Sequence, residues 1–157
     1  MTTRLLAGMV VAVVCACSGP TEGTRFAPAG LDRAAAEVVV ASAVTAMAQA
    51  LADLDATGLP GHFAGPALHQ LTGRVGWMRA RGMRMQEQGS RHALLSWDLE
   101  AGEAVLEVEA QVRMLSADQP DPPWSATTRQ WWSRLASIAG AWLVVDDRDL
   151  PPDQWRR

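Results

Sequence analysis

Apolar and polar residues alternate with a helical period from Leu31 to about Ala56. Residues three or four apart share one side of a helix, and one side here is apolar: Ala36, Val39, Val40, Ala43, Met47, Ala50, Leu51 and Leu54. The opposite side carries Ser42, Thr45, Gln49 and Asp53. Asp32 is a suitable N-cap, and Gly58 and Pro60 predict that the helix ends before them. We therefore expect a long amphipathic helix whose small-residue face lies on a sheet.

A second helix is predicted to begin near Pro66, a residue favoured in the first helical turn, and to stop at Gly82. Gly73 and Gly76 lower its intrinsic helix propensity. Its apolar side consists of Leu68, Leu71, Val75 and Met78. Its other side carries Arg74, Trp77 and Arg81.

Beyond Gly82 the period becomes two, which is typical of β-strands. The alternation covers Ala93–Leu99, Glu103–Leu115, Thr127–Ile138 and Ala141–Asp147. One face of the second stretch consists of Ala104, Leu106, Val108, Ala110, Val112 and Met114. The connections are predicted to be Ala101-Gly102, the loop Ser116–Pro123 and Ala139-Gly140. Two helices followed by a curved antiparallel sheet make an α+β domain.

The composition supports one globular domain. The chain has 157 residues, of which 48% are hydrophobic, enough for one core. Its formal net charge is −3, and a mildly acidic protein has no overall attraction to nucleic acid. We therefore expect no nucleic-acid partner.

The beginning of the chain predicts export. Arg4 precedes an apolar run from Leu5 to Val14, a pattern typical of a signal peptide and about half the length of a membrane-spanning helix. Val14-Cys15-Ala16-Cys17 resembles the bacterial lipobox, in which the last cysteine receives a diacylglyceryl group. The alternative is an ordinary secretory signal that contains cysteine. Both cysteines lie in this segment, so the folded part has no disulfide of its own.

These features divide the chain into four parts. We expect a lipoprotein signal peptide at 1–16, a flexible tether at 17–30, the α+β domain at 31–150 and a C-terminal tail at 151–157. Lipidation of Cys17, with palmitate-type acyl chains, would hold the protein on the cell membrane, facing outside the cytoplasm.

Two segments resemble a known superfamily. In SRLASIAGAWLVVDDRDLP, residues Gly140–Asp146 resemble the turn, tryptophan and alternating aliphatic residues of nuclear-transport-factor-like domains, which are cystatin-like cones. LPGHFAGPALHQLTGRVGWMRARGM is similar to the second helix of such domains in exported bacterial proteins and in organelle-division and import proteins, the SnoaL-like and intermembrane-space types. The resemblance covers about residues 31–150. It implies helices packed on a curved antiparallel sheet, but no single function, because the superfamily contains enzymes and binding modules.

The sequence offers little catalytic chemistry. The resemblance implies that enzymes of this fold, such as ketosteroid isomerases, dehydratases and polyketide cyclases, use a carboxylate or histidine base inside the cone, often with a tyrosine. Tyrosine is absent here. Asp98 and His92 lie on or beside a strand, but Asp98 falls on the face opposite Trp97 and Leu99, which indicates solvent. We therefore expect no catalytic residue.

No metal or cofactor site is expected either. The three histidines, His62, His69 and His92, share no metal-ligand spacing. The acidic run Asp146–Asp149 lacks the alternating oxygen ligands of a calcium loop, so we interpret it as a solvated strand end.

Two groups of residues have both a structural and a functional interpretation. Trp97, Trp132 and Trp142 lie in predicted strands among aliphatic residues, which is typical of a core, but they would also suit the wall of an apolar ligand pocket. Arg74, Trp77 and Arg81 form either a solvated helix face or a patch that binds a membrane or a partner protein.

Three hypotheses for the function remain open. The first is a membrane-anchored envelope lipoprotein whose non-catalytic domain binds an envelope protein partner or helps to assemble a complex. The second is a carrier or sensor of a small apolar ligand in the cone, and the third is a small enzyme of the cyclase or dehydratase kind. An enclosed apolar cavity would favour the carrier, whereas a filled cone with an exposed apolar patch would favour partner binding.

Overall fold

Two helices precede four antiparallel strands in the protein, whose computed structural model describes residues 30–155. The elements are α1 (Arg33–Asp53), α2 (Gly65–Ala80), β1 (Arg84–Asp98), β2 (Glu103–Leu115), β3 (Ser125–Ile138) and β4 (Ala141–Leu150). Two short 3₁₀ turns lie at Leu59–Gly61 and Pro152–Gln154. The strands form one sheet in the order β1-β2-β3-β4. The predicted α+β class is confirmed.

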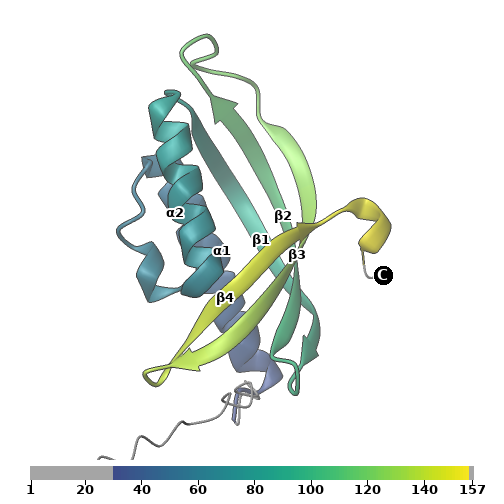
Figure 1. The fold of residues 1–157 in the computed structure, drawn as a ribbon. Helices are drawn as coiled ribbons and strands as arrows, with labels where there is room; N and C mark the ends of the chain where they lie inside the picture. The colour runs from purple at the N-terminus through teal and green to yellow at the C-terminus, as the bar shows by residue number, and fades with distance from the viewer. Residues whose placement is uncertain (1–29, 156–157) are drawn as a thin grey trace, which may run out of the picture.

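Both helices cover the concave side of the curved sheet (Figure 1). α1 packs mainly against β1, and α2 packs against β4. Large side chains from both layers are almost fully buried between them: Met47, Leu51, Met78, Leu106, Leu135 and Val144. The concave side is therefore filled by one continuous hydrophobic core.

α1 begins as the sequence predicts. The Asp32 side chain accepts a hydrogen bond from the Ala35 backbone N–H at 2.8 Å, which satisfies one free donor of the first turn. The helix ends at Asp53, earlier than expected, because Leu54 adopts the left-handed conformation with φ 55°. Val44 is buried and Val39 is only half-buried, so the apolar face is turned slightly from the predicted one.

Among the described residues, one helix, α1, is long and apolar enough to cross a membrane by length and composition. Its buried side lies on the sheet, as in the core helix of a soluble domain: Ala36, Val40, Ala43, Val44, Met47, Ala50 and Leu51.

α2 is a complete helix despite its two interior glycines. Pro66 lies in its first turn, as predicted, and Gly82 beyond its end has φ +64°. The buried residues are Ala67, Leu71, Val75 and Met78. Leu68, which was expected in this set, is only half-buried.

The observed strands extend beyond the predicted ones. β2 has the predicted bounds, whereas β1 begins at Arg84 instead of Ala93, and β4 continues to Leu150. The first part of β1 escaped prediction because its pairing with β2 shifts in register between Gln88 and Arg91. Such a bulge interrupts the alternation on which the prediction depends.

The pairing of β1 with β2 shifts again between Leu94 and Ser96, and a further bulge lies in β4. Arg134 pairs with Asp146 and the next residue, Leu135, pairs with Val144, so Val145 has no partner in register. The extra residue reverses the two faces of the strand beyond it, because side chains alternate with a period of two.

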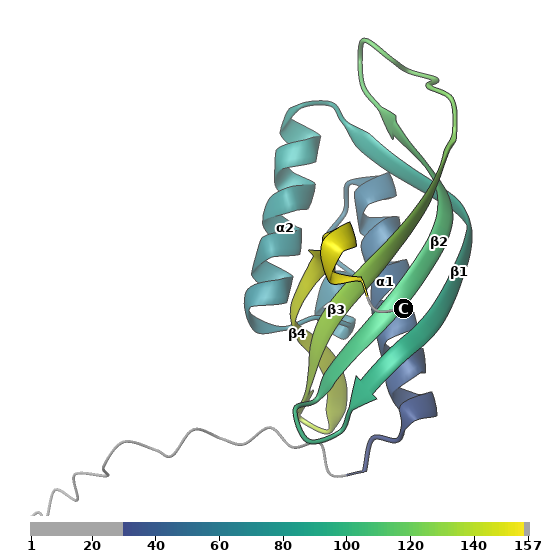
Figure 2. The same cartoon turned by 90° about the vertical axis from the view of Figure 1, so that its right-hand side faces the viewer.

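Different loops and hairpins lie at the two ends of the molecule (Figure 2). The first described residues lie at the same end as the β1–β2 and β3–β4 hairpins. The β2–β3 loop and the last turn of α2 lie at the opposite end.

Candidate functional site

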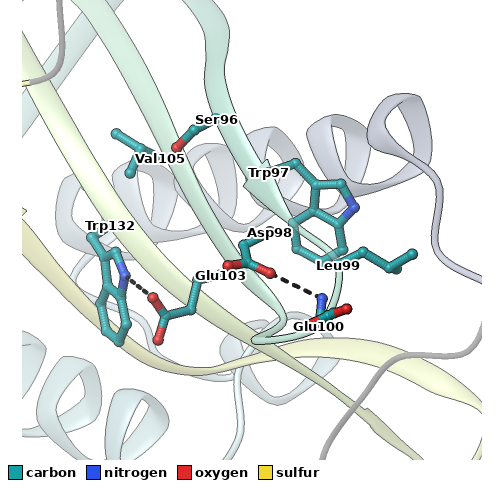
Figure 3. A pocket seen from close by; sticks show the side chains of 8 residues that line it. All are labelled: Ser96, Trp97, Asp98, Leu99, Glu100, Glu103, Val105 and Trp132. Carbon is teal, nitrogen blue, oxygen red and sulfur yellow. Dashed lines mark hydrogen bonds between the residues drawn. The ribbon is translucent and has the colours of Figure 1, made fainter.

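A half-enclosed pocket of about 510 Å³ lies on the outer face of the sheet, next to the β1–β2 hairpin (Figure 3). Its floor consists of Ser96 and Val105, which are neighbours in the sheet register and are followed in the same row by Trp132. The hollow exists because the side chains of Ser96 and Val105 are much smaller than the neighbouring indole ring of Trp132. Eight residues line it: Ser96, Trp97, Asp98, Leu99, Glu100, Glu103, Val105 and Trp132.

Hydrogen bonds hold the wall of this pocket in place. The Trp132 indole N–H donates to Glu103 Oε2 at 3.2 Å, and Arg134 Nη2 lies 3.0 Å from Glu103 Oε1. The guanidinium groups of Arg134 and Arg148 lie 5.4 and 4.8 Å from the centroid of the Trp132 ring. Trp132 is therefore fixed by a charged network on the surface rather than buried in the core.

The three tryptophans from the sequence analysis do not share one cavity. Trp97 borders the pocket from β1, and its indole N–H donates to the Leu31 backbone oxygen at 3.3 Å. Trp142, near the start of β4, packs against the hydrophobic core and is not in the pocket lining. Trp97 and Trp132 both border the hollow outside the cone, but Trp97 pairs with the buried Ala104 and also packs against the hydrophobic core, whereas Trp132 lies on the outer face.

The three α2 residues from the sequence analysis, Arg74, Trp77 and Arg81, do not form one patch. The Arg81 guanidinium lies 4.3 Å from the centroid of the Trp77 ring, which is 48% exposed. Arg74 instead acts electrostatically on Asp147 and Asp149 of β4. The Trp77–Arg81 pair lies near the end of α2 that is remote from the first described residues (Figure 1).

A buried carboxyl group lies on the concave face, where the sequence analysis expected a solvated strand end. That expectation was wrong for Asp147, which is only 9% exposed, because the bulge at Val145 turns it inward. Burial raises the pKa of Asp147 from 3.8 to about 6, although a hydrogen bond from the Trp131 side chain and the charge of Arg74 act in the opposite direction. Burial also raises the pKa of Asp149.

The neighbour of Asp147 in the sheet is also unusual. Ser133 pairs with Asp147, is 1% exposed, and its buried hydroxyl oxygen has no hydrogen-bond partner. Buried hydroxyls are normally paired. Asp147, Ser133 and Trp131 therefore form a polar site within an otherwise apolar interior, and perturbed carboxyl groups of this kind are frequent at functional sites.

The other candidate residues lie apart. Asp98 is exposed and accepts hydrogen bonds from the backbone N–H groups of Glu100 and Ala101, so it shapes the hairpin turn. His92 is half-buried and its Nε2 is without a partner. Within residues 30–155, no group of three histidine, cysteine or acidic side chains is placed to hold a metal ion. Cys17 lies outside the described residues.

Comparison with solved structures identifies the fold. The intermembrane-space region of the chloroplast protein ARC6 superposes with a TM-score of 0.66, covering 76% of this chain and 96% of that chain at 17% identity. A protein from Novosphingobium aromaticivorans, proposed to be an aromatic ring hydroxylase, gives a TM-score of 0.51, with 77% and 93% covered at 9% identity. No family model and no curated protein matches the chain.

The domain has the nuclear-transport-factor-like fold. The resemblance inferred from the closing hairpin is thereby confirmed as a fold. At these identities the likeness extends to the fold alone, since the nuclear-transport-factor-like fold supports unrelated functions.

Within this nuclear-transport-factor-like fold, the sequence signals for the two sites differ in strength. The outer pocket depends on small residues at Ser96 and Val105, which an alternating pattern does not distinguish from ordinary strand positions. Asp147 was missed because its position depends on a single unpaired residue. The sequence does contain Ser133 in β3 and the acidic pair Asp146-Asp147 in β4. Ser133 and Asp147 face each other only when the two strands are paired with the bulge at Val145.

Proposed function

We propose that this chain is an exported lipoprotein whose nuclear-transport-factor-like domain is a non-catalytic module that binds a protein partner in the cell envelope. The observation that carries the proposal is the outer pocket, which is open to solvent, has an aromatic wall at Trp132 and has the exposed Leu99 on its rim. Exposed apolar and aromatic surface of this kind is typical of protein-binding sites.

A partner is favoured over a small-molecule cargo because the cone is filled. The space between helices and sheet is occupied by core side chains that are less than 2% exposed, such as Met47, Leu51 and Leu106. A carrier of an apolar ligand would need that volume to be empty. The half-enclosed pocket on the outer face, of about 510 Å³, is large enough to admit a side chain from another protein.

Two of the three carboxylates of the pocket support binding rather than catalysis. Asp98 is engaged by the backbone of the hairpin turn, and Glu103 is engaged by Trp132 and Arg134. A general base must be free to take a proton from a substrate. These groups instead maintain the shape of the pocket.

Anchoring rests on the lipobox-like Val14–Cys17 in the sequence. The folded domain begins at the same end of the molecule as the hairpin that carries the pocket (Figure 2). A lipid on Cys17 would therefore hold the pocket close to the membrane surface, within reach of another envelope protein.

The test is site-specific photo-crosslinking of the full-length lipoprotein in membranes of its own host. A photoreactive residue at Leu99, which is 49% exposed, should give a discrete crosslinked protein, and Trp132→Ala should remove that product. The matched control is Val38 on α1, which is 65% exposed and is not part of the pocket lining. Equal crosslinking from Leu99 and Val38, or none from either, would contradict the proposal.

A second function is favoured by one specific observation, the buried Asp147 beside the unpartnered Ser133 hydroxyl. These groups suit the recognition of a small polar ligand, or acid–base chemistry on it, but the core side chains of the concave face would have to move apart to admit that ligand. Native mass spectrometry of the protein purified gently from its host tests this alternative. A bound mass that leaves on denaturation would favour it, and a bare protein mass would favour partner binding.

A further inference from the structure

We propose that the outer pocket recognises a cationic side chain, arginine or lysine, flanked by apolar residues in a segment of the partner protein. This inference rests on the proposed function, since it names the chemistry by which the same pocket would select its partner. Three properties of the lining support it: its charge, its hydrogen-bonding capacity and its walls.

The charge of the lining is entirely negative. Asp98, Glu100 and Glu103 contribute carboxylates, and none of the lining residues is an arginine. Arg134 compensates Glu103 through the ion pair at 3.0 Å. Asp98 and Glu100 remain without a cationic side chain within ion-pair distance among the described residues. A cation entering the pocket would gain from both, and an anionic lipid headgroup would be repelled.

The hydrogen-bonding capacity of the pocket is biased toward acceptors. Both indole N–H groups are already used inside the protein, that of Trp97 by the Leu31 backbone oxygen and that of Trp132 by Glu103. The lining therefore offers carboxylate oxygens, while its strongest potential donors are occupied. A ligand rich in N–H donors, such as a guanidinium or an ammonium group, matches this arrangement.

The walls suit the aliphatic stem of a basic side chain. Lysine and arginine bury their methylene groups on apolar surface while the charged head stays near water. Val105 and the rim residue Leu99 supply that surface. The ring of Trp132 already has the guanidinium groups of Arg134 and Arg148 within cation–π distance, so it contributes to the pocket as a fixed wall.

The test uses two synthetic tripeptides, acetyl-Leu-Arg-Leu-amide and acetyl-Leu-Gln-Leu-amide, added to the full-length protein in a zwitterionic detergent. Binding is followed by the NMR signals of the indole N–H groups, assigned with Trp97→Phe and Trp132→Phe. The arginine peptide should shift the Trp97 and Trp132 signals, and the glutamine peptide should bind at least about threefold more weakly. Added salt should weaken the binding of the arginine peptide.

Two glutamate-to-glutamine substitutions test whether the carboxylates of the pocket attract the arginine peptide. Glu100→Gln should weaken the arginine peptide by about threefold, because it removes one uncompensated carboxylate of the rim. Glu109→Gln, an exposed glutamate of β2 outside this pocket, should leave the affinity unchanged. Equal affinity for the two peptides, equal effects of the two substitutions, or no shift at millimolar peptide would each overturn the inference.

Failure of this inference is distinguishable from failure of the proposed function. If crosslinking from Leu99 yields a discrete partner but the peptides do not discriminate, the pocket binds a partner by another chemistry. If Leu99 yields no partner, the proposed function itself fails.

Discussion

Asp147 lies directly across from Ser133 in the β3–β4 pair, so a buried carboxyl group faces a buried hydroxyl that has no other partner. In the apolar interior the neutral acid is favoured over the carboxylate, which is why the pKa of Asp147 is raised to about 6. The neutral acid can donate a hydrogen bond to the Ser133 oxygen, whereas the carboxylate can only accept one.

The first prediction concerns pH. The pKa of Asp147 in the folded protein, about 6, exceeds its ordinary value of 3.8, so the folded state binds the proton more tightly than the unfolded chain. The free energy of unfolding should therefore fall as pH rises from 3.8 to 6 and then stay at the lower level, with a change of about 1–2 kcal/mol. Urea titrations across this range measure it.

The matched variants for this prediction lie side by side in β4. Asp147→Asn should remove most of the pH dependence and raise the stability at pH 7, because the amide stays neutral. Some dependence should remain, because the pKa of Asp149 is also raised. Asp146→Asn, at a residue that pairs with Arg134 on the outer face, should keep most of the dependence, because the charge of Asp146 raises the pKa of Asp147 less than burial does. An unchanged pH profile in Asp147→Asn would show that another group is responsible.

The second prediction concerns the interior glycines of α2. A Cβ atom added at Gly73 or Gly76 would meet no atom within 4 Å, so alanine fits at both positions. The double substitution should raise the free energy of unfolding by about 1–2 kcal/mol, because alanine has the higher helix propensity. Gly82→Ala, at φ +64°, should lower it by about 1 kcal/mol. Denaturant unfolding of the three proteins decides the matter, and a loss of stability in the double variant would refute the prediction.

A third prediction contrasts two tryptophans. Trp131 is buried in the core and donates a hydrogen bond to Asp147, whereas Trp77 is half-exposed under the Arg81 guanidinium. Trp131→Ala should lower the free energy of unfolding by about 3–5 kcal/mol, and Trp77→Ala by less than about 1 kcal/mol. Comparable losses in the two variants would mean that Trp77 is also part of the core.

The fourth prediction concerns the lipid. In the host, Cys17→Ala should convert membrane-bound protein into unprocessed or released protein, because the acceptor thiol is lost. Fractionation of cells and detection of the mature amino terminus measure the outcome, with Cys15→Ala as the matched control that keeps the acceptor. A Cys17→Ala protein that is cleaved yet still sediments with membranes would exclude lipid anchoring.

The sequence was sufficient for the elements that follow one regular period. β2 has its predicted bounds because its alternation is uninterrupted, and α1 begins at its predicted cap because Asp32 is a strong capping residue. The α+β class follows from the order of these elements. The first part of β1 was missed because the register shift between Gln88 and Arg91 disrupts the period.

The candidate sites were less accessible to sequence analysis. The pattern singled out Trp97 and Trp132, but not that they border a hollow on the outer face, since this depends on the size of the neighbouring Ser96 and Val105 across two strands. The orientation of Asp147 depends on strand pairing, which a single sequence does not display. Lipidation of Cys17 stays a prediction.

The unpaired Val145 also makes β4 tolerant of one particular change in length. Loss of that one codon would restore a regular ladder in which Asp146 is still opposite Arg134 and Asp147 is still opposite Ser133. Asp147 would therefore stay turned toward the interior. Descendants of such a gene could lose the bulge and keep the acidic interior without a single amino-acid substitution.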